Sequence, residues 1–159
     1  MKNIINEEPD IHWGFLDVKD KVVLDLGCGR FYSSISTAEY FLNSGAKLVI
    51  GVDLSDIGVI NDRFEMKVLN VSSADDLQNL LLSYYPDVIK CDIEGAERYF
   101  NSIASLPTET LQFAVEYHDN ATKLICERVL KDWGFETEHY QLLGEDINRI
   151  GVIHGWKSF

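Results

Sequence analysis

Glycines and acidic side chains stand where apolar segments of the chain end. Gly27 and Gly29 follow the apolar run that begins at Val22, and Asp53 closes a second apolar run, residues 48–52. Glycine has no Cβ, so a ligand can lie directly against the backbone at these two positions. A carboxylate such as Asp53 can accept hydrogen bonds from both hydroxyls of a ribose. The spacing therefore predicts a nucleoside-binding site, with a solvated turn at Asp53 as the alternative.

A second group of polar residues could carry acid–base chemistry. Asp92 follows the apolar run of residues 88–91, Glu116 lies in the run of residues 111–117, and His118 comes directly after it. Histidine has an ordinary pKa near 6.5, so we expect His118, or alternatively Asp92, to accept a proton at neutral pH. The same three side chains could instead hold a divalent cation. Their separation along the chain is not that of a compact ligand motif, and we favour a site without a metal.

Two further acids, Glu94 and Glu97, lie shortly after Asp92. A carboxylate in the first turn of a helix can simply stabilise the helix dipole, and a helical segment is predicted over residues 96–106. For Glu94 this explanation and a catalytic role are both kept. For Glu97 we expect the helix role alone.

Strands and helices alternate along the chain, which determines how these side chains must be positioned. Strands are predicted over residues 21–27, 46–55, 64–72, 86–95, 110–119, 135–144 and 148–157, and helices over residues 33–45, 73–85, 96–106 and 121–134. Alternation requires crossover connections and a mostly parallel sheet covered by helices on both faces. The last two strands follow one another directly, so one antiparallel strand is expected in a terminal hairpin. We predict an α/β domain with a seven-stranded sheet over residues 20–159, preceded by an N-terminal extension, residues 1–19.

Ligands of open α/β sheets bind beyond the carboxyl ends of the strands. For the nucleoside ligand this rule selects Asp25, Gly27, Cys28, Gly29, Arg30, Asp53, Leu54, Asn70 and Val71. For the reacting groups it selects Asp92, Glu94, Glu116 and His118. Arg30 supplies a positive charge suited to a carboxylate of the ligand.

The spacing of the glycines argues against a dinucleotide. Nicotinamide cofactors prefer G-x-G-x-x-G, and the position of the third glycine is Tyr32 in this chain. A ligand without a pyrophosphate needs less of this pattern, and the acidic Asp25 before the glycines would suit a cationic group. Both observations favour an adenosine that bears an amino acid. A nucleotide-sugar or NAD-binding domain is the less favoured alternative.

The segments VVLDLGCGR and VIGVDLS together resemble the first two motifs of class I S-adenosylmethionine-dependent methyltransferases. The resemblance covers nearly the whole chain and implies a Rossmann-like fold with S-adenosylmethionine as the cofactor. It implies that Gly27 and Gly29 border the methionine part, that Asp25 reaches the ammonium indirectly, and that Asp53 binds the ribose. Phe31 departs from the family, which usually has a third glycine there. A side chain at this position would narrow the methionine pocket or pack under the helix.

A narrower resemblance lies further along the chain. VIKCDIEGAE, residues 88–97, is similar to the signature of FkbM-type methyltransferases, and AVEYH, residues 114–118, is similar to their next strand. This resemblance implies O-methylation of a hydroxyl on a sugar or another small molecule. The short chain and Phe31 keep a second hypothesis open, a non-catalytic S-adenosylmethionine-binding module or accessory subunit.

Charge and hydropathy bear on partners and location. The chain has 26 acidic and 14 basic residues, a formal net charge of −12. Such a field repels a phosphate backbone, so we expect a small-molecule acceptor and no nucleic acid. No apolar run approaches the roughly 18 residues that cross a bilayer, and the N-terminus lacks the apolar core of a signal peptide, so we expect a cytoplasmic protein without membrane contact. The three cysteines include no CxxC pair, which indicates neither a zinc site nor a disulfide framework.

Overall fold

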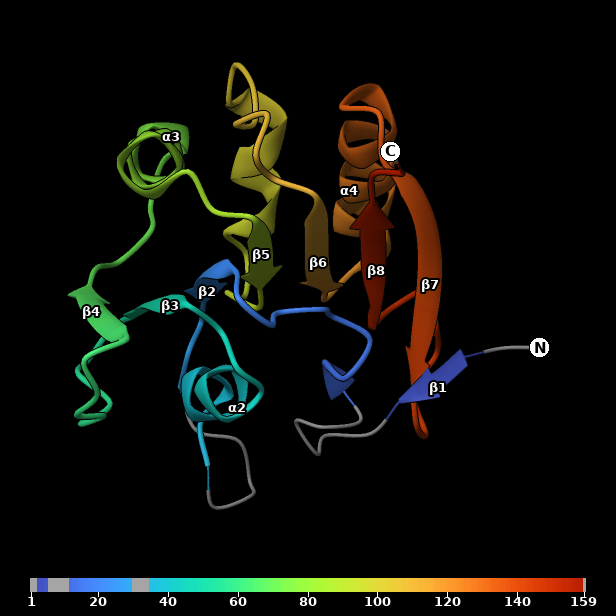
Figure 1. Ribbon diagram of the computed structural model, residues 1–159. Helices are drawn as coiled ribbons and strands as arrows, with labels where there is room; N and C mark the ends of the chain where they lie inside the picture. The colour runs from blue at the N-terminus through green and yellow to red at the C-terminus, as the bar shows by residue number, and fades with distance from the viewer. Residues whose placement is uncertain (1–2, 6–11, 30–34, 159) are drawn as a thin grey trace.

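The computed structural model describes residues 3–5, 12–29 and 35–158. These residues form an eight-stranded sheet in the order β1-β7-β8-β6-β5-β2-β3-β4 (Figure 1). The strands are β1 (Asn3–Ile5), β2 (Val22–Leu26), β3 (Leu48–Asp53), β4 (Phe64–Val68), β5 (Val88–Cys91), β6 (Gln112–Tyr117), β7 (Glu136–Leu142) and β8 (Gly151–Trp156). The helices are α2 (Thr37–Asn43), α3 (Ala74–Tyr84), the 3₁₀ helix η1 (Glu97–Ser102) and α4 (Asn120–Asp132).

Strand β8 runs antiparallel to both of its neighbours, β6 and β7, while the other paired strands of the sheet are parallel. This confirms the predicted α/β fold with a mostly parallel sheet and a terminal hairpin. The predicted count of seven strands is wrong, because the short strand β1 pairs with β7 and forms the edge of the sheet, with Ile5 opposite Leu142. Three residues are too few for the alternation of side chains that marks a strand in sequence.

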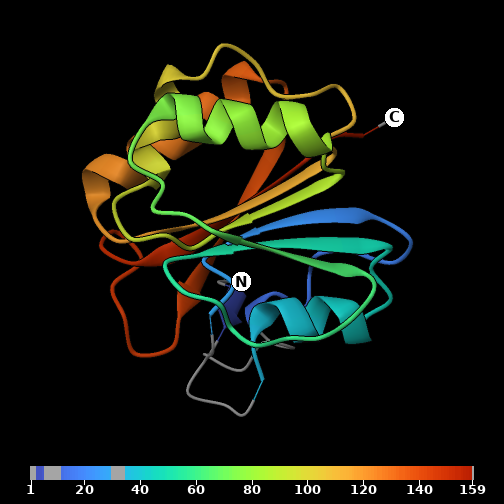
Figure 2. The same ribbon diagram turned by 90° about the vertical axis from the view of Figure 1, so that its left-hand side faces the viewer.

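Helices cover both faces of the sheet, as expected (Figure 2). On one face α3, η1 and α4 pack over the central strands, and on the other face lie α2 and residues 12–18. Trp13 is fully buried there, in the same cluster as Phe41 of α2. Strands β2 and β5 are buried on both faces, which explains why they read as continuous apolar runs rather than alternating ones.

The α-helices α2, α3 and α4 each begin with a side-chain cap. Ser36 accepts from the backbone N–H of Glu39 in a capping box at α2. Ser73 at α3 and Asp119 at α4 each accept a hydrogen bond from a backbone N–H of the first turn. The segment predicted as a helix over residues 96–106 is shorter, the 3₁₀ helix Glu97–Ser102, and Ala96 before it offers no capping side chain. No helix within the described ranges is both long enough and apolar enough to cross a membrane.

Helix α3 offers a test of this packing, because Leu77 is 1% exposed and Leu82 on the same helix is 53% exposed. Leu77→Ala should lower the free energy of unfolding by about 2–5 kcal/mol, since it leaves a cavity under the helix. Leu82→Ala removes the same atoms from the solvent face and should change it by less than about 0.5 kcal/mol. Urea unfolding followed by circular dichroism measures both. Equal losses in the two variants would contradict the orientation of α3.

Candidate functional site

The loop after β2 approaches neighbouring backbone so closely that only glycine fits. Gly27 has φ of +80°, and a Cβ there would lie 2.1 Å from the carbonyl oxygen of Asp92. The backbone N–H groups of Gly27 and Cys28 both donate to the carbonyl oxygen of Val52, at 2.8 and 3.2 Å. A Cβ at Gly29 would lie 2.9 Å from Asp53 Oδ2. The loop is therefore held against the ends of β3 and β5, and it faces Asp53.

A cleft of about 910 Å³ opens at this edge of the sheet. Of the residues selected from the sequence, it is lined by Gly27, Gly29, Asp53, Leu54, Asn70, Val71, Asp92, Glu94 and Glu116. Arg30, together with Phe31 and Tyr32, lies outside the described residues. Asp25 and Cys28 are buried beneath the loop and are not among the residues that line the cleft.

Asp25 is paired inside the protein rather than open to the cleft. Its Oδ1 lies 3.0 Å from Lys90 Nζ, and its Oδ2 accepts a hydrogen bond of 2.6 Å from Thr37 Oγ1. The Asp25 carboxylate is fully buried. A direct contact between Asp25 and a ligand in the cleft is therefore not part of this arrangement. The Cys28 thiol is also buried, which raises its pKa and makes it unreactive.

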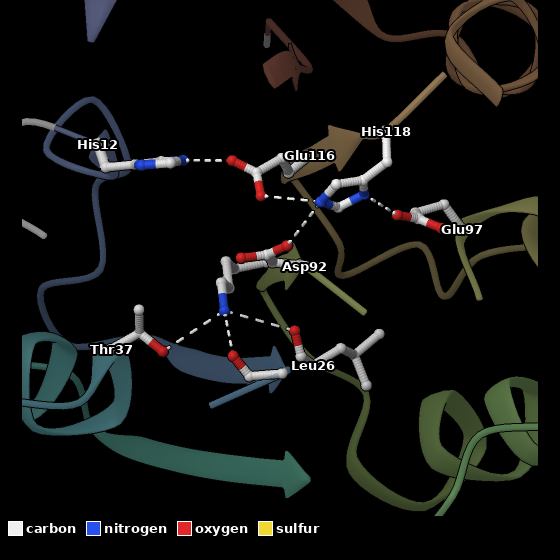
Figure 3. A network of polar contacts seen from close by, with 9 residues as sticks. His12, Leu26, Thr37, Asp92, Glu97, Glu116 and His118 are labelled. Carbon is white, nitrogen blue, oxygen red and sulfur yellow. Dashed lines mark hydrogen bonds and ion pairs between the residues drawn. The ribbon is translucent and has the colours of Figure 1, made fainter. Parts of the chain in front are cut away.

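Beside the cleft, three carboxylates surround one imidazole (Figure 3). Asp92 and Glu116 line the cleft, whereas Glu97 and His118 are not among its lining residues. His118 Nε2 lies 3.3 Å from Glu116 Oε2 and 3.6 Å from Asp92 Oδ1, and its Nδ1 lies 2.9 Å from Glu97 Oε1. The second oxygen of Glu116, Oε1, lies 3.0 Å from Nε2 of the buried His12. The predicted catalytic residues Asp92, Glu116 and His118 thus meet, whereas Glu94 lines the cleft with an exposed side chain.

This arrangement changes the proton affinity of each group. Hydrogen bonds to Glu116 and Glu97 raise the pKa of His118 to about 10. Burial and the charge of Glu116 raise the pKa of Asp92 to about 8. Burial would raise the pKa of Glu116, but its hydrogen bonds with His118 and His12 lower it well below the ordinary value. The contacts of His118 therefore favour the imidazolium form at neutral pH, in place of the neutral ring that an ordinary pKa near 6.5 would give.

A divalent cation is the alternative occupant of the same place. One ligand atom from each of Asp92, Glu116 and His118 lies within 4.8 Å of the other two. A cation bound there would have to displace the proton from His118 Nε2, because a metal ligand must be deprotonated. The spacing is thus compatible with a metal, but the same contacts also stabilise the protonated ring.

The sequence prediction missed three residues of this region, His12, Glu97 and Lys90. His12 belongs to the segment expected to be an N-terminal extension. Its partner Glu116 is 104 residues further along the sequence, so no local pattern connects the two. Glu97 was expected only to stabilise a helix, yet its side chain is 1% exposed and bonds to His118. Lys90 did carry a signal, because a charged residue within a fully buried strand requires partners.

Comparison with known proteins identifies the fold. No family model matches the chain. A ribosomal protein L11 methyltransferase from Haemophilus influenzae is 35% identical over 78 residues, which are 49% of this chain and 24% of that protein. The chain thus matches about a quarter of the length of this relative.

Several solved structures share the arrangement over nearly the whole chain. A precorrin-6y C5,15-methyltransferase from Geobacter metallireducens has a TM-score of 0.61 at 17% identity and covers 94% of this chain and 86% of its own. A proposed RNA methyltransferase from Pyrococcus horikoshii has a TM-score of 0.57 at 18% identity, and the match covers 95% of this chain and 81% of that protein. A magnesium protoporphyrin IX methyltransferase from Synechocystis, with S-adenosylmethionine bound, has a TM-score of 0.54 at 16% identity, and the match covers 89% of this chain and 72% of that protein. The fold is therefore the Rossmann-like fold of class I methyltransferases.

These likenesses correct one expectation and leave another without support. Proteins similar to this chain include ones described as acting on RNA and on a ribosomal protein, so the exclusion of nucleic acid from the net charge is wrong. Net charge describes the average field of the whole surface and does not decide what a single cleft accepts. The likeness extends to the class I fold and not to the FkbM-type subgroup.

The proton on His118 gives a direct test of the cluster. Folding raises the pKa of His118 from 6.5 to about 10, so its contribution to stability is complete below pH 6.5 and is lost as the pH rises through about 10. Imidazole ¹³C–¹H spectra at pH 8 should show His118, assigned with His118→Gln, still protonated. His139, whose pKa burial lowers, should be neutral and serves as the internal control. Titration of His118 near pH 6.5 would contradict the geometry of the cluster.

Proposed function

We propose that the chain binds S-adenosylmethionine in the cleft and transfers its methyl group to an acceptor held at the acidic cluster. The observation that carries the proposal is that one cleft joins the loop of Gly27 and Gly29, the facing Asp53, and the Asp92–Glu116 pair. Several solved structures of the same fold are described as methyltransferases, one of them with this cofactor bound, which supports the proposal.

The cofactor half of the cleft suits a nucleoside with an amino-acid tail. The backbone N–H of Leu54 donates to Asp53 Oδ1 at 2.7 Å, which leaves Oδ2, the oxygen beside Gly29, to accept from the ribose hydroxyls. The wall next to it is formed by Leu69 and Val71 at the end of β4, where an adenine ring could pack. The methionine part would then lie along the glycine loop, toward Asp92.

The acidic half suits removal of a proton from the acceptor. Methyl transfer is a displacement at the sulfonium carbon, so the acceptor atom must present a lone pair in line with the methyl–sulfur bond. A group whose pKa lies near the working pH is the most effective base. Asp92 lines the cleft, and burial with the charge of Glu116 raises its pKa toward this range. Hydrogen bonds lower the pKa of Glu116, and His118 is not among the residues that line the cleft. In this proposal Asp92 takes the proton from the acceptor, and the His118–Glu116 pair orients and polarises the Asp92 carboxylate.

The acceptor in this proposal carries a dissociable proton, on a hydroxyl or an amine. The hydroxyl chemistry depends on the FkbM-like segment, residues 88–97, alone. RNA and ribosomal protein enter as candidate acceptors because related chains are described as acting on them. The alternative of a non-catalytic cofactor-binding module shares the Asp53 half of the site. The cluster around His118 favours catalysis, because binding a cofactor does not require it.

Cofactor binding is tested at Asp53. Asp53→Ala removes both ribose contacts and should weaken binding of S-adenosylhomocysteine by about 100-fold, as expected for two hydrogen bonds to a charged group. Asp56→Ala, three positions later on the exposed loop, is the matched control and should change it by less than about threefold. Isothermal titration calorimetry measures the affinity of the two variants and of the wild-type chain for S-adenosylhomocysteine. Equal affinities in all three proteins, or no binding by the wild type, would refute the proposed cofactor site.

Catalysis is tested at Asp92. Transfer of tritium from labelled S-adenosylmethionine should first be measured with ribosomal RNA, ribosomal protein and hydroxyl compounds to find an acceptor. With that acceptor, Asp92→Asn should lower kcat by about 10²–10⁴-fold, the usual contribution of a general base. Asp75→Asn, on the exposed side of α3, should leave kcat unchanged. If Asp92→Asn retains full activity, Asp92 is not the base.

A further inference from the structure

We propose that Lys90 is a positioning residue that holds the backbone of Gly27 in the form that binds the cofactor. The inference rests on the proposed cofactor site and adds a residue that does not itself touch the ligand. Lys90 lies in the middle of β5, and its side chain is 1% exposed. Its ammonium group donates to the carbonyl oxygen of Gly27 at 2.6 Å and to that of Leu26 at 3.4 Å.

The ammonium group is fixed from several directions. Asp25 stands opposite Lys90 in the β2–β5 pairing, and its Oδ1 lies 3.0 Å from Nζ. Thr37, at the start of α2, donates to the other oxygen of Asp25 and lies 3.5 Å from Nζ. The ring of Trp13 lies 5.2 Å from Nζ, within the range of a cation–π contact. Burial alone would lower the pKa of Lys90, but the Asp25 and Asp92 charges raise it, so the group stays cationic.

This cation determines the direction of the Gly27 carbonyl. The Gly27 N–H is already held by the carbonyl oxygen of Val52, so both polar groups of the residue are anchored. Because the peptide bond is planar, fixing the Gly27 carbonyl also fixes the N–H of Cys28, which donates to the same Val52 oxygen. The chain then reaches Gly29 against Asp53, where the cofactor is proposed to bind. Lys90 thus acts on the ligand through the loop.

An ion pair alone would not require a lysine at this position. A buried pair can often be exchanged for two uncharged side chains of similar size at little cost in stability. Such an exchange would leave the buried Gly27 carbonyl without its donor, however, and the left-handed glycine could rotate to find another. Stability and cofactor affinity therefore respond differently to the same substitution, which separates a positioning role from a structural one.

The experiment measures S-adenosylhomocysteine binding by calorimetry and compares the variant Asp25→Asn with the double variant Asp25→Asn/Lys90→Met. Lys90→Met alone leaves Asp25 buried and unpaired and should lower Tm strongly, so Asp25→Asn/Lys90→Met, which removes both charges, is the decisive variant. Relative to Asp25→Asn, this double variant should recover or exceed the Tm yet bind about tenfold or more weakly, as expected for a lost charged hydrogen bond. Lys157→Met, which removes a lysine that lies 4.6 Å from the ring of Phe135, is the control and should bind like the wild type.

Amide hydrogen exchange gives a readout that needs no ligand. Exchange at Gly27 and Cys28 should be faster in the double variant than in Asp25→Asn. The inference is overturned if the double variant binds within about threefold of Asp25→Asn and exchanges at the same rate. If the wild-type chain binds no S-adenosylhomocysteine, the proposed function fails, and the exchange rates at Gly27 and Cys28 still decide the role of Lys90.

Discussion

The arrangement of the site depends on a lysine ammonium buried at the centre of the sheet. A charge in this position is costly unless it is paired and fully hydrogen-bonded. Lys90 meets that condition only when β5 lies beside β2 with Asp25 opposite it, and when Thr37 at the start of α2 reaches the same carboxylate. The register of the two central strands, the position of α2 and the course of the glycine loop are therefore coupled through one pair of charges.

The two parts of the cleft offer a ligand different kinds of groups, backbone near Gly27 and ionisable side chains near Glu116. Around Gly27 the ligand would meet backbone that is held in place by hydrogen bonds from Lys90 and to Val52. Around Glu116 the surface consists of ionisable groups, with one imidazole between three carboxylates, so acidic groups outnumber basic ones. A sulfonium cofactor is cationic, so an excess of negative charge at this end favours its approach as well as the removal of a proton from an acceptor.

Local patterns predicted the parts of the fold that are determined locally. Buried parallel strands such as β2 and β5 read as apolar runs, and Gly27 after β2 has no room for a side chain against the Asp92 backbone, so both could be identified in the sequence. Strand β1 could not, because its only signal is its pairing with β7, more than a hundred positions away. The same limit hid His12, whose place beside Glu116 depends on how the N-terminal segment crosses the sheet.

The ordinary pKa that the sequence suggested for His118 differs from that of the folded site for another physical reason. The position of His118 was anticipated correctly, since it follows β6 at the same edge of the sheet as Asp92. Its proton affinity was not, because pKa depends on partners, and Glu97 approaches from η1 on the other side of the ring. Residue type and place along a strand indicate which groups meet, but the charge state follows only when every neighbour is counted. In this cluster the contacts favour a protonated imidazole, and burial together with the charge of Glu116 raises the pKa of Asp92, which is why the proposed base is Asp92.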